Sequence, residues 1–245
     1  MDETERNRRK SNLFIILTAI FMMNALLAEM IGGKIFSLAK LFEWTGAVNI
    51  DLSVGVIIWP VVFILSDIIN EYFGRNGVKK LSYLASGLIL YSFIVIFFST
   101  KMPPADFWLQ NNSVDPQGRP FDANYAFTMV FSQSMGIIIG SITAFLVSQI
   151  IDAHTFHFLK GITGNKKLWL RATGSTAISQ VIDSFIILFI AFYVAGNWTI
   201  KQVIAVATVQ YLYKMGIIIL LTPLIYLAHY IIDRYLGLKK LESSH

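Results

Sequence analysis

Long apolar segments separated by short polar ones run along almost the whole chain. Each approaches or exceeds the ~20 apolar residues that a membrane-spanning helix needs. None shows the alternation of apolar and polar positions that is typical of a strand, so helices are expected throughout. The pattern predicts six spans, at about Leu13–Ile31, Leu52–Ile69, Leu81–Phe98, Tyr125–Ile151, Leu168–Val194 and Val203–Ile232. We therefore expect an all-α integral membrane protein with six transmembrane helices.

Polar ends flank this apolar region. We expect residues 1–12 to form a charged cytoplasmic tail and residues 13–236 to form the six-helix domain. Residues 237–245 are expected to be a C-terminal tail, whose end resembles added expression sequence. A turn-rich loop at Thr100–Asn124 separates the third segment from the fourth. The helices therefore divide into two sets of three, which is compatible with an inverted repeat.

Composition and charge agree with a membrane protein. The 245-residue chain is 55% hydrophobic and 14% charged, with a mean hydropathy of +0.60, whereas a soluble domain carries about 25% charged residues. A net charge of +5 could indicate nucleic-acid binding, but the lysines and arginines gather in alternate polar segments. Because cytoplasmic loops are the basic ones, both termini are predicted to be cytoplasmic. We expect the bilayer as a partner and no nucleic acid, and a homodimer is compatible with the sequence.

The fifth apolar segment contains two polar residues in an unusual place. Gln180 and Asp183 lie three positions apart, on one face of the expected helix. Asp183 is expected roughly 22 Å from the helix start, near the centre of the bilayer. Inserting an ionisable group there costs on the order of 3 kcal/mol, and such groups usually mark functional sites.

Other segments place polar residues at comparable depth, in two layers. The central layer, interpreted as a substrate-binding cavity, contains Asn24, Gln133, Gln180, Asp183, Tyr211 and Lys214. The layer nearer the cytoplasm, interpreted as gating or coupling residues, contains Asp67, Asn70, Glu71, Gln149 and Asp152. Several such groups on separate helices indicate a polar cavity between the helices.

Each of these residues also has a simpler interpretation. Asp183 and Lys214 can form an ion pair that fixes helix packing, and Asn24 can hold helices together. The group around Glu71 can cap a helix end by facing Arg75 and Lys79 just beyond it. Asp152 can be an ordinary carboxylate at a helix end. These alternatives stay open at the level of sequence.

The chain contains no recognisable catalytic or cofactor-binding motif. Neither a phosphate-binding G-x-x-x-x-G-K-[ST] loop nor an H-E-x-x-H or G-x-S-x-G motif is present. The chain has no cysteine. His154 and His157 would share a helix face, but no further ligands complete a metal site. We therefore expect no enzymatic activity, no metal and no cofactor.

Two short motifs carry a family resemblance. Residues 66–74 read S-D-I-I-N-E-Y-F-G, and residues 179–185 read S-Q-V-I-D-S-F. They resemble the D-x-x-x-E-x-[FY]-G and S-Q-x-x-D-[ST] signatures of the queuosine precursor transporter family, integral membrane proteins of the vitamin-uptake type. The length and the expected layout of spans also agree with this family.

The resemblance implies import of 7-deazaguanine precursors of queuosine (preQ0, preQ1 or queuine) across the bacterial inner membrane. It carries Asp67, Glu71, Gln180 and Asp183 into the site as motif positions. A guanine-like edge presents an N–H beside an amino group, which a carboxylate can accept, and glutamine can donate to the neighbouring carbonyl. Aromatic rings can stack on such a base. The candidates within the spans are Trp59, Phe93, Phe185 and Tyr211.

Three classes of function follow. The first is a secondary transporter that works by alternating access, rocking one half against the other. The second is the substrate-binding subunit of an ATP-driven vitamin or nucleobase importer, which would need partner chains to transport. The third, an intramembrane enzyme or a structural membrane protein, is disfavoured because no catalytic set is recognisable.

Overall fold

The computed structural model describes residues 2–41, 43, 51–132, 135–164 and 167–238, most of which are helical. The α-helices are α1 (Glu3–Ile31), α2 (Leu38–Leu41), α3 (Trp59–Lys101), α4 (Asp106–Asn111), α5 (Ala123–Phe131), α6 (Met135–Thr163), α7 (Leu168–Leu188) and α8 (Ile200–Leu236). A 3₁₀ turn, η1 (Val54–Ile57), precedes α3, and a π-helical segment, η2 (Phe189–Val194), continues α7.

Five of the described helices are long and apolar enough to cross a membrane: α1, α3, α6, α7 with η2, and α8. The expected class, an all-α multi-pass membrane protein, is confirmed. The count differs from the predicted six because one helix, α3, contains the predicted segment Leu81–Phe98 and most of the predicted segment Leu52–Ile69. The predicted segment Tyr125–Ile151 is also wrong as one span, since it divides into α5 and α6.

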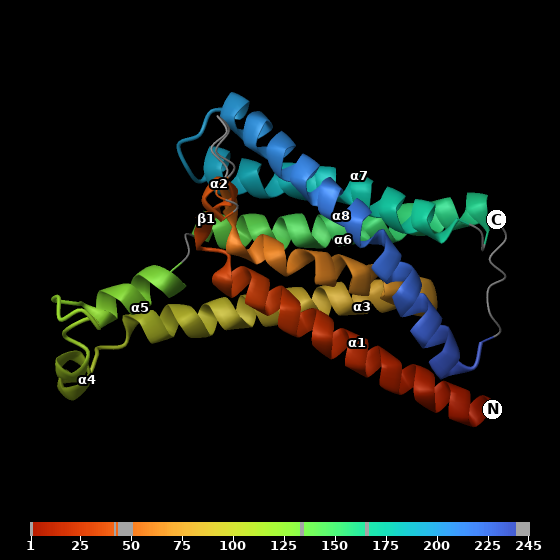
Figure 1. Cartoon of the computed structure of the whole chain (residues 1–245), viewed down its shortest axis with the longest axis horizontal. Helices are drawn as coiled ribbons and strands as arrows, with labels where there is room; N and C mark the ends of the chain where they lie inside the picture. The colour runs from red at the N-terminus through yellow and green to blue at the C-terminus, as the bar shows by residue number, and fades with distance from the viewer. Residues whose placement is uncertain (1, 42, 44–50, 133–134, 165–166, 239–245) are drawn as a thin grey trace.

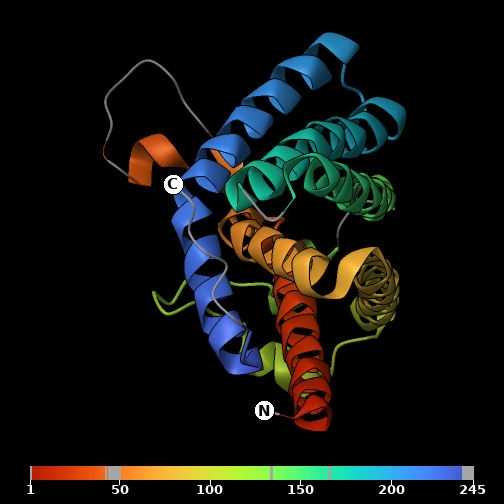
Figure 2. The ribbon, with the colours of Figure 1, turned by 90° about the vertical axis from the view of Figure 1, so that its right-hand side faces the viewer.

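Helix α3 bends sharply at Gly74. The backbone there has φ 68° and ψ −173°, a region that essentially only glycine adopts without strain. The arm before Gly74 and the arm after it run back alongside each other, as the orange and yellow parts of α3 show (Figures 1 and 2). The predicted segments Leu52–Ile69 and Leu81–Phe98 therefore correspond to two arms of one bent helix.

The first arm of α3 is the centre of the bundle. It lies between α1 and α6, and α7 lies on the far side of α6 (Figures 1 and 2). Helix α1 buries Leu17, Phe21, Ala25 and Ala28, which recur every three or four residues and so share one face. This face packs against apolar residues of both arms of α3. Helix α8 crosses the others at an angle (Figure 1).

The start of α1 and the end of α8 meet at one end of the molecule. Arg9 Nη1 donates a hydrogen bond to the Tyr235 carbonyl at 3.0 Å, and its guanidinium lies over the Tyr235 ring. The bend of α3, the end of α6 and the start of α7 lie at this same end (Figure 1). These are the basic segments of the sequence. Residues 3–12, which lie within the expected tail, form the first turns of α1, and the Asp2 side chain caps this helix.

The opposite end carries the irregular structure. Strands β1 (Ile35–Ser37) and β2 (Asp51–Ser53) pair antiparallel between α1 and α3, so the expectation of helices throughout is wrong there. These strands are too short to leave an alternating pattern in the sequence. Helices α4 and α5 lie at the far end of the second arm of α3 (Figure 1).

Candidate functional site

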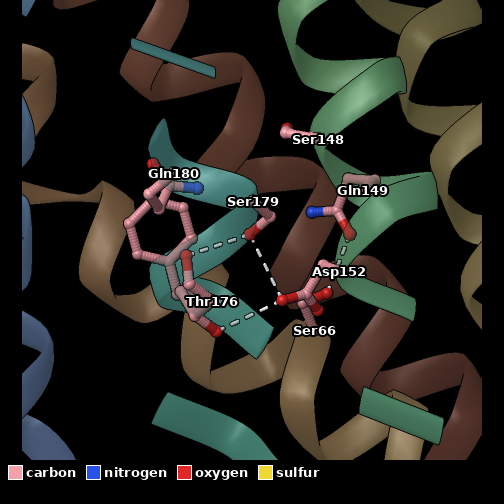
Figure 3. A pocket seen from close by; sticks show the side chains of 8 residues that line it. Ser66, Ser148, Gln149, Asp152, Thr176, Ser179 and Gln180 are labelled. Carbon is pink, nitrogen blue, oxygen red and sulfur yellow. Dashed lines mark hydrogen bonds between the residues drawn. The ribbon is translucent and has the colours of Figure 1, made fainter. Parts of the chain in front are cut away.

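A polar pocket lies where α3, α6 and α7 meet (Figure 3). It is lined by Phe63 and Ser66 from α3, Ser148, Gln149 and Asp152 from α6, and Thr176, Ser179 and Gln180 from α7. The polar residues among them are all buried. The pocket has room for about one water molecule. A larger ligand would fit only if the three helices moved apart.

Helical spacing explains why each helix offers several groups to this pocket. On α6, Ser148 precedes Asp152 by four residues, so the two lie on one face. On α7, Thr176 precedes Gln180 by the same interval. On α3, Phe63 precedes Ser66 by three residues, so an aromatic ring and a hydroxyl group share the face that lines the pocket.

Two buried aspartates, from α3 and α6, contact one hydroxyl group from α7. Thr176 Oγ1 lies 3.5 Å from Asp67 Oδ1 and 3.4 Å from Asp152 Oδ1. Ser179 Oγ lies 3.3 Å from Asp152 Oδ1. Asp67 is 3% exposed and Asp152 is 5% exposed. Neither forms an ion pair with any lysine, arginine or histidine that the structure describes.

Two oxygen atoms of this pocket lack a hydrogen-bond partner. Ser66 Oγ donates to Gln149 Oε1 at 2.8 Å, which satisfies that amide oxygen. By contrast, Gln180 Oε1 and Asp152 Oδ2 are buried and have no partner among the described residues. Because an unsatisfied buried acceptor is costly, these two atoms are available to a ligand. The pocket thus joins Gln180, expected in the central layer, with Gln149 and Asp152, expected nearer the cytoplasm.

One turn further along α3, Glu71 lies between two basic side chains. Glu71 Oε1 accepts hydrogen bonds from Lys160 Nζ at 3.0 Å and from Arg171 Nη2 at 2.9 Å. Arg171 is fully buried. Arg75 and Lys79, which the sequence offered as alternative partners, follow the bend at Gly74 and are exposed.

Asp183 and Lys214 form an ion pair between α7 and α8. Lys214 Nζ donates to Asp183 Oδ2 at 2.6 Å. Lys214 also lines a second, mainly apolar pocket, together with Trp59, Phe63 and Tyr213. The ion pair that the sequence left as an alternative is therefore present, and Phe63 belongs to both pockets.

The remaining predicted residues lie in varied surroundings. Asn24 donates to the Ile20 carbonyl of its own helix at 2.8 Å, and Tyr211 is half-buried on α8. Asn70 is fully buried, and neither atom of its amide group has a partner among the described residues. Gln133 lies outside the described residues.

Sequence reasoning missed Phe63, Ser66, Ser148, Thr176 and Ser179 as pocket residues. It also missed Lys160 and Arg171 as partners of Glu71. The hydroxyl residues could have been found from spacing, because Thr176 and Ser179 precede the two polar motif residues of α7 by four positions each.

The histidine pair on α6 does not stand out as a metal site. His154 Nδ1 lies 2.8 Å from the Ile150 carbonyl of its own helix. Among the described residues, no group of three or more histidines or carboxylates is arranged to hold a metal ion.

Comparisons with known proteins agree with a membrane transporter. The profile of the family described as "Putative vitamin uptake transporter" matches residues 53–228. A protein of Bacillus subtilis strain 168 named "Probable queuosine precursor transporter" is 25% identical over 184 residues, covering 74% of this chain and 72% of the relative. A Haemophilus influenzae protein of the same name is 25% identical over 174 residues, covering 69% of this chain and 65% of the relative. No solved structure matches.

These matches confirm the resemblance carried by residues 66–74 and 179–185, both of which lie within the matched region. The match extends from β2 to α8, and so includes every helix that lines the polar pocket. The chain belongs to the "Putative vitamin uptake transporter" family.

Proposed function

We propose that this protein imports queuosine precursors of the 7-deazaguanine class across the bacterial inner membrane. The names of its relatives support the substrate class, and the family supports transport. The observation that carries the proposal is the pocket between α3, α6 and α7, where Gln180 Oε1 and Asp152 Oδ2 are buried and have no hydrogen-bond partner in the described part of the chain. Such unsatisfied acceptors suit the N–H and amino groups of a guanine-like edge.

In the proposed complex, Gln180 and Gln149 hold the polar edge of the base through their amide groups. Phe63 offers an aromatic face from α3, and Trp59 lies one turn before it, with the two rings stacked at 5.8 Å. A flat base can lie against such rings. Asp183 and Lys214 lie on the side of the second pocket, which also includes Phe63. We propose that they join the site when the pockets open into each other.

Transport by alternating access requires the pocket to open to each side in turn. The described pocket is closed, with room for about one water molecule. We propose that the cluster of Glu71, Lys160 and Arg171 is the cytoplasmic gate, because it ties together the same three helices one turn away from the pocket. Opening on that side would separate these charges.

We also propose a topology for the chain in the membrane. Both arms of α3 cross the bilayer, which gives six crossings in all. The end of the molecule where α1 begins and α8 ends faces the cytoplasm, because the basic segments gather there (Figure 1). The bend at Gly74 then lies on the cytoplasmic side.

The decisive experiment is uptake of radiolabelled preQ0 or preQ1 by liposomes that contain only this chain. We expect the purified chain to exchange labelled base across the membrane. If the chain binds base but never moves it, it is instead the substrate-binding subunit of an ATP-driven importer. In that case co-purification with an ATPase should restore uptake. Absence of both binding and exchange would refute the proposed substrate class.

The role of Asp183 can be tested separately by Asp183→Asn. If Asp183 contacts the base, the variant folds but binds preQ0 at least about tenfold more weakly. If Asp183 only neutralises Lys214, the variant loses stability and the double variant Asp183→Asn with Lys214→Met regains it. A thermal-unfolding series with and without base separates these outcomes.

A further inference from the structure

We propose that Asp67 and Asp152 together bind a single proton, and that this proton drives the import of the base. This inference rests on the proposed transport function and names its energy source. The pair would take up one proton from the external side, forming an O–H bond on one carboxylate. The same proton would leave that oxygen to the cytoplasmic side, so the charge of the pair alternates between −2 and −1.

The first argument is charge. Asp67 and Asp152 are nearly fully buried, and both contact the hydroxyl of Thr176. Two ionised carboxylates this close inside a membrane protein repel each other, and each is costly on its own. No described basic side chain forms an ion pair with either. The pair therefore lacks at least one positive charge.

The second argument counts hydrogen-bond donors. A hydroxyl group has one hydrogen, yet Thr176 Oγ1 lies within reach of both carboxylates. Ser179 Oγ likewise lies between Asp152 Oδ1 and the Thr176 carbonyl, at 3.3 and 3.1 Å. Asp152 Oδ2 has no donor among the described residues. A bound proton supplies both a charge and a donor, whereas a sodium ion supplies only the charge.

The third argument is that other ionisable groups nearby are engaged elsewhere. Besides the pair, the helices packed around it carry Glu71 and Tyr72 on α3, His157 and Lys160 on α6, Arg171 and Asp183 on α7, Lys214, His229 and Asp233 on α8, and Glu29 on α1. Glu71 holds both cations of its own layer, and the Asp183–Lys214 pair is closed.

The groups on α8 and α1 are occupied in the same way. The Tyr72 hydroxyl donates to Asp233 Oδ1 at 2.6 Å and lies 3.0 Å from His229 Nδ1. Glu29 accepts a hydrogen bond from Ser141. None of these groups is placed to neutralise Asp67 or Asp152.

The fourth argument is position. Asp152 and Gln180 both line the pocket proposed for the base (Figure 3). Gln180 is 4% exposed, and its Oε1 has no partner among the described residues. A base seated on these acceptors would directly alter the environment of the carboxylate pair. Proton binding and base binding would therefore be linked, as coupled transport requires.

The test uses liposomes containing the full chain and radiolabelled preQ0, an uncharged base, with the membrane potential clamped. Exchange of labelled for unlabelled base without any gradient tests the transport function alone. An external pH one unit below the internal pH then tests coupling. With one proton per base, we expect accumulation of up to about tenfold, since one pH unit is a tenfold activity ratio. A pH-sensitive dye inside the liposomes should report acidification during uptake.

Asp67→Asn is the variant, and Asp106→Asn, an exposed Asp-to-Asn change on α4, is its control. We expect Asp67→Asn to keep measurable exchange but to lose accumulation and internal acidification, whereas Asp106→Asn keeps all three. Exchange by the wild type without any response to the pH gradient would overturn the coupling proposal alone. A response to a sodium gradient instead of the pH gradient would also overturn it.

If Asp67→Asn fails to fold, the pH dependence of base binding by the wild type tests the coupling proposal instead. Base affinity should then change several-fold between pH 5 and pH 8, with sodium having no effect. An affinity that does not depend on pH overturns the proposal. If the wild type shows no exchange at all, the proposed function fails, and the coupling that rests on it fails too.

Discussion

Asp67 and Glu71 lie four residues apart on the same face of α3, yet their surroundings are opposite. Glu71 meets one cation from α6 and one from α7, Lys160 and Arg171. Asp67 meets a second carboxylate from α6, Asp152, and a hydroxyl from α7. The same three helices therefore build two acidic sites in consecutive layers. Glu71 has two cationic partners, whereas Asp67 has none among the residues that the structure describes.

The difference separates two uses of a buried acid. A carboxylate matched by cations holds helices in place, and removing one partner leaves the others unpaired. A pair of carboxylates without a cation contributes little to helix packing, but the charge of the pair can change when it binds a proton. Being acidic and deep in an apolar helix is therefore not enough to assign a role. The partners contributed by neighbouring helices decide it.

The largest expected effect on stability is at Glu71, whose charge is balanced by Lys160 and Arg171. Glu71→Gln removes the charge of the carboxylate that Lys160 and the fully buried Arg171 share. We expect a loss of about 3 kcal/mol of stability, measured by thermal or denaturant unfolding in detergent. Glu3→Gln, an exposed change at the start of α1, is the control and should have little effect. A loss of stability below about 1 kcal/mol for Glu71→Gln would show that these ion pairs do not hold the three helices together.

A second effect concerns the bend that follows both acids. Gly74→Ala forces a side chain into a backbone conformation that non-glycine residues avoid, at a cost of about 1–3 kcal/mol. The new Cβ would meet no atom closer than His157 Cε1 at 4.0 Å, so the loss reports backbone strain alone. Gly87→Ala, in the helical second arm with open space around it, should be neutral or stabilising. Equal unfolding midpoints for the two variants would contradict the bend.

A smaller effect on stability is expected at Asp67, which lies near a second carboxylate and has no ion-pair partner among the described residues. Asp67→Asn removes one of two like charges and breaks no ion pair. Stability should change by less than about 1 kcal/mol, or increase, because repulsion falls and no counter-charge is exposed. Unfolding measured beside Glu71→Gln gives the comparison directly. A loss as large as that of Glu71→Gln would mean that Asp67 has a cationic partner after all.

The smallest effect is expected at Asp115, a half-buried carboxylate in the connection between α4 and α5, which serves as a reference for the two buried acids of α3. Asp115 accepts hydrogen bonds from the Arg119 backbone N–H and guanidinium and from the Gln117 N–H, and these contacts lower its pKa. The stabilisation that ionised Asp115 gives to this turn is present at pH values above its pKa in the unfolded chain. It is lost as the pH falls through the lower pKa that Asp115 has in the folded protein.

An NMR titration of the Arg119 amide should therefore give a midpoint below about 3.9, the usual value for aspartate. Replacing the side chain by Arg119→Ala should move that midpoint up. A midpoint at the usual value in the wild type would show that the turn does not hold Asp115.

Much of the fold could be predicted from the sequence, because apolar length alone marks a spanning helix. The predicted segment Leu168–Val194 matches the bounds of α7 and η2 together, and Val203–Ile232 lies within α8. The break between α5 and α6 was missed because the segment is apolar on both sides of it. The bend in α3 was missed because one glycine in a polar stretch looks like any loop.

The candidate site was predicted as a set of residues but not as a set of contacts. Asp67, Gln149, Asp152 and Gln180 stand out because they are polar within apolar segments. Their partners depend on how each helix is rotated about its axis, which a single sequence does not record. Arg171 is fully buried inside α7, but the sequence does not reveal this, because a basic residue near the end of a span resembles the basic residues of a cytoplasmic loop.

The contact between Arg9 and Tyr235 has a consequence for how the chain can be cut and rejoined. It brings the first helix and the last helix together at one end of the molecule, so a short linker could join them into a ring. New termini could then be opened in the α4–α5 connection, at the opposite end of the second arm of α3, without interrupting a spanning helix. Such a permuted chain would present its ends at the opposite end of the helix bundle, where attached labels could report on that part of the molecule.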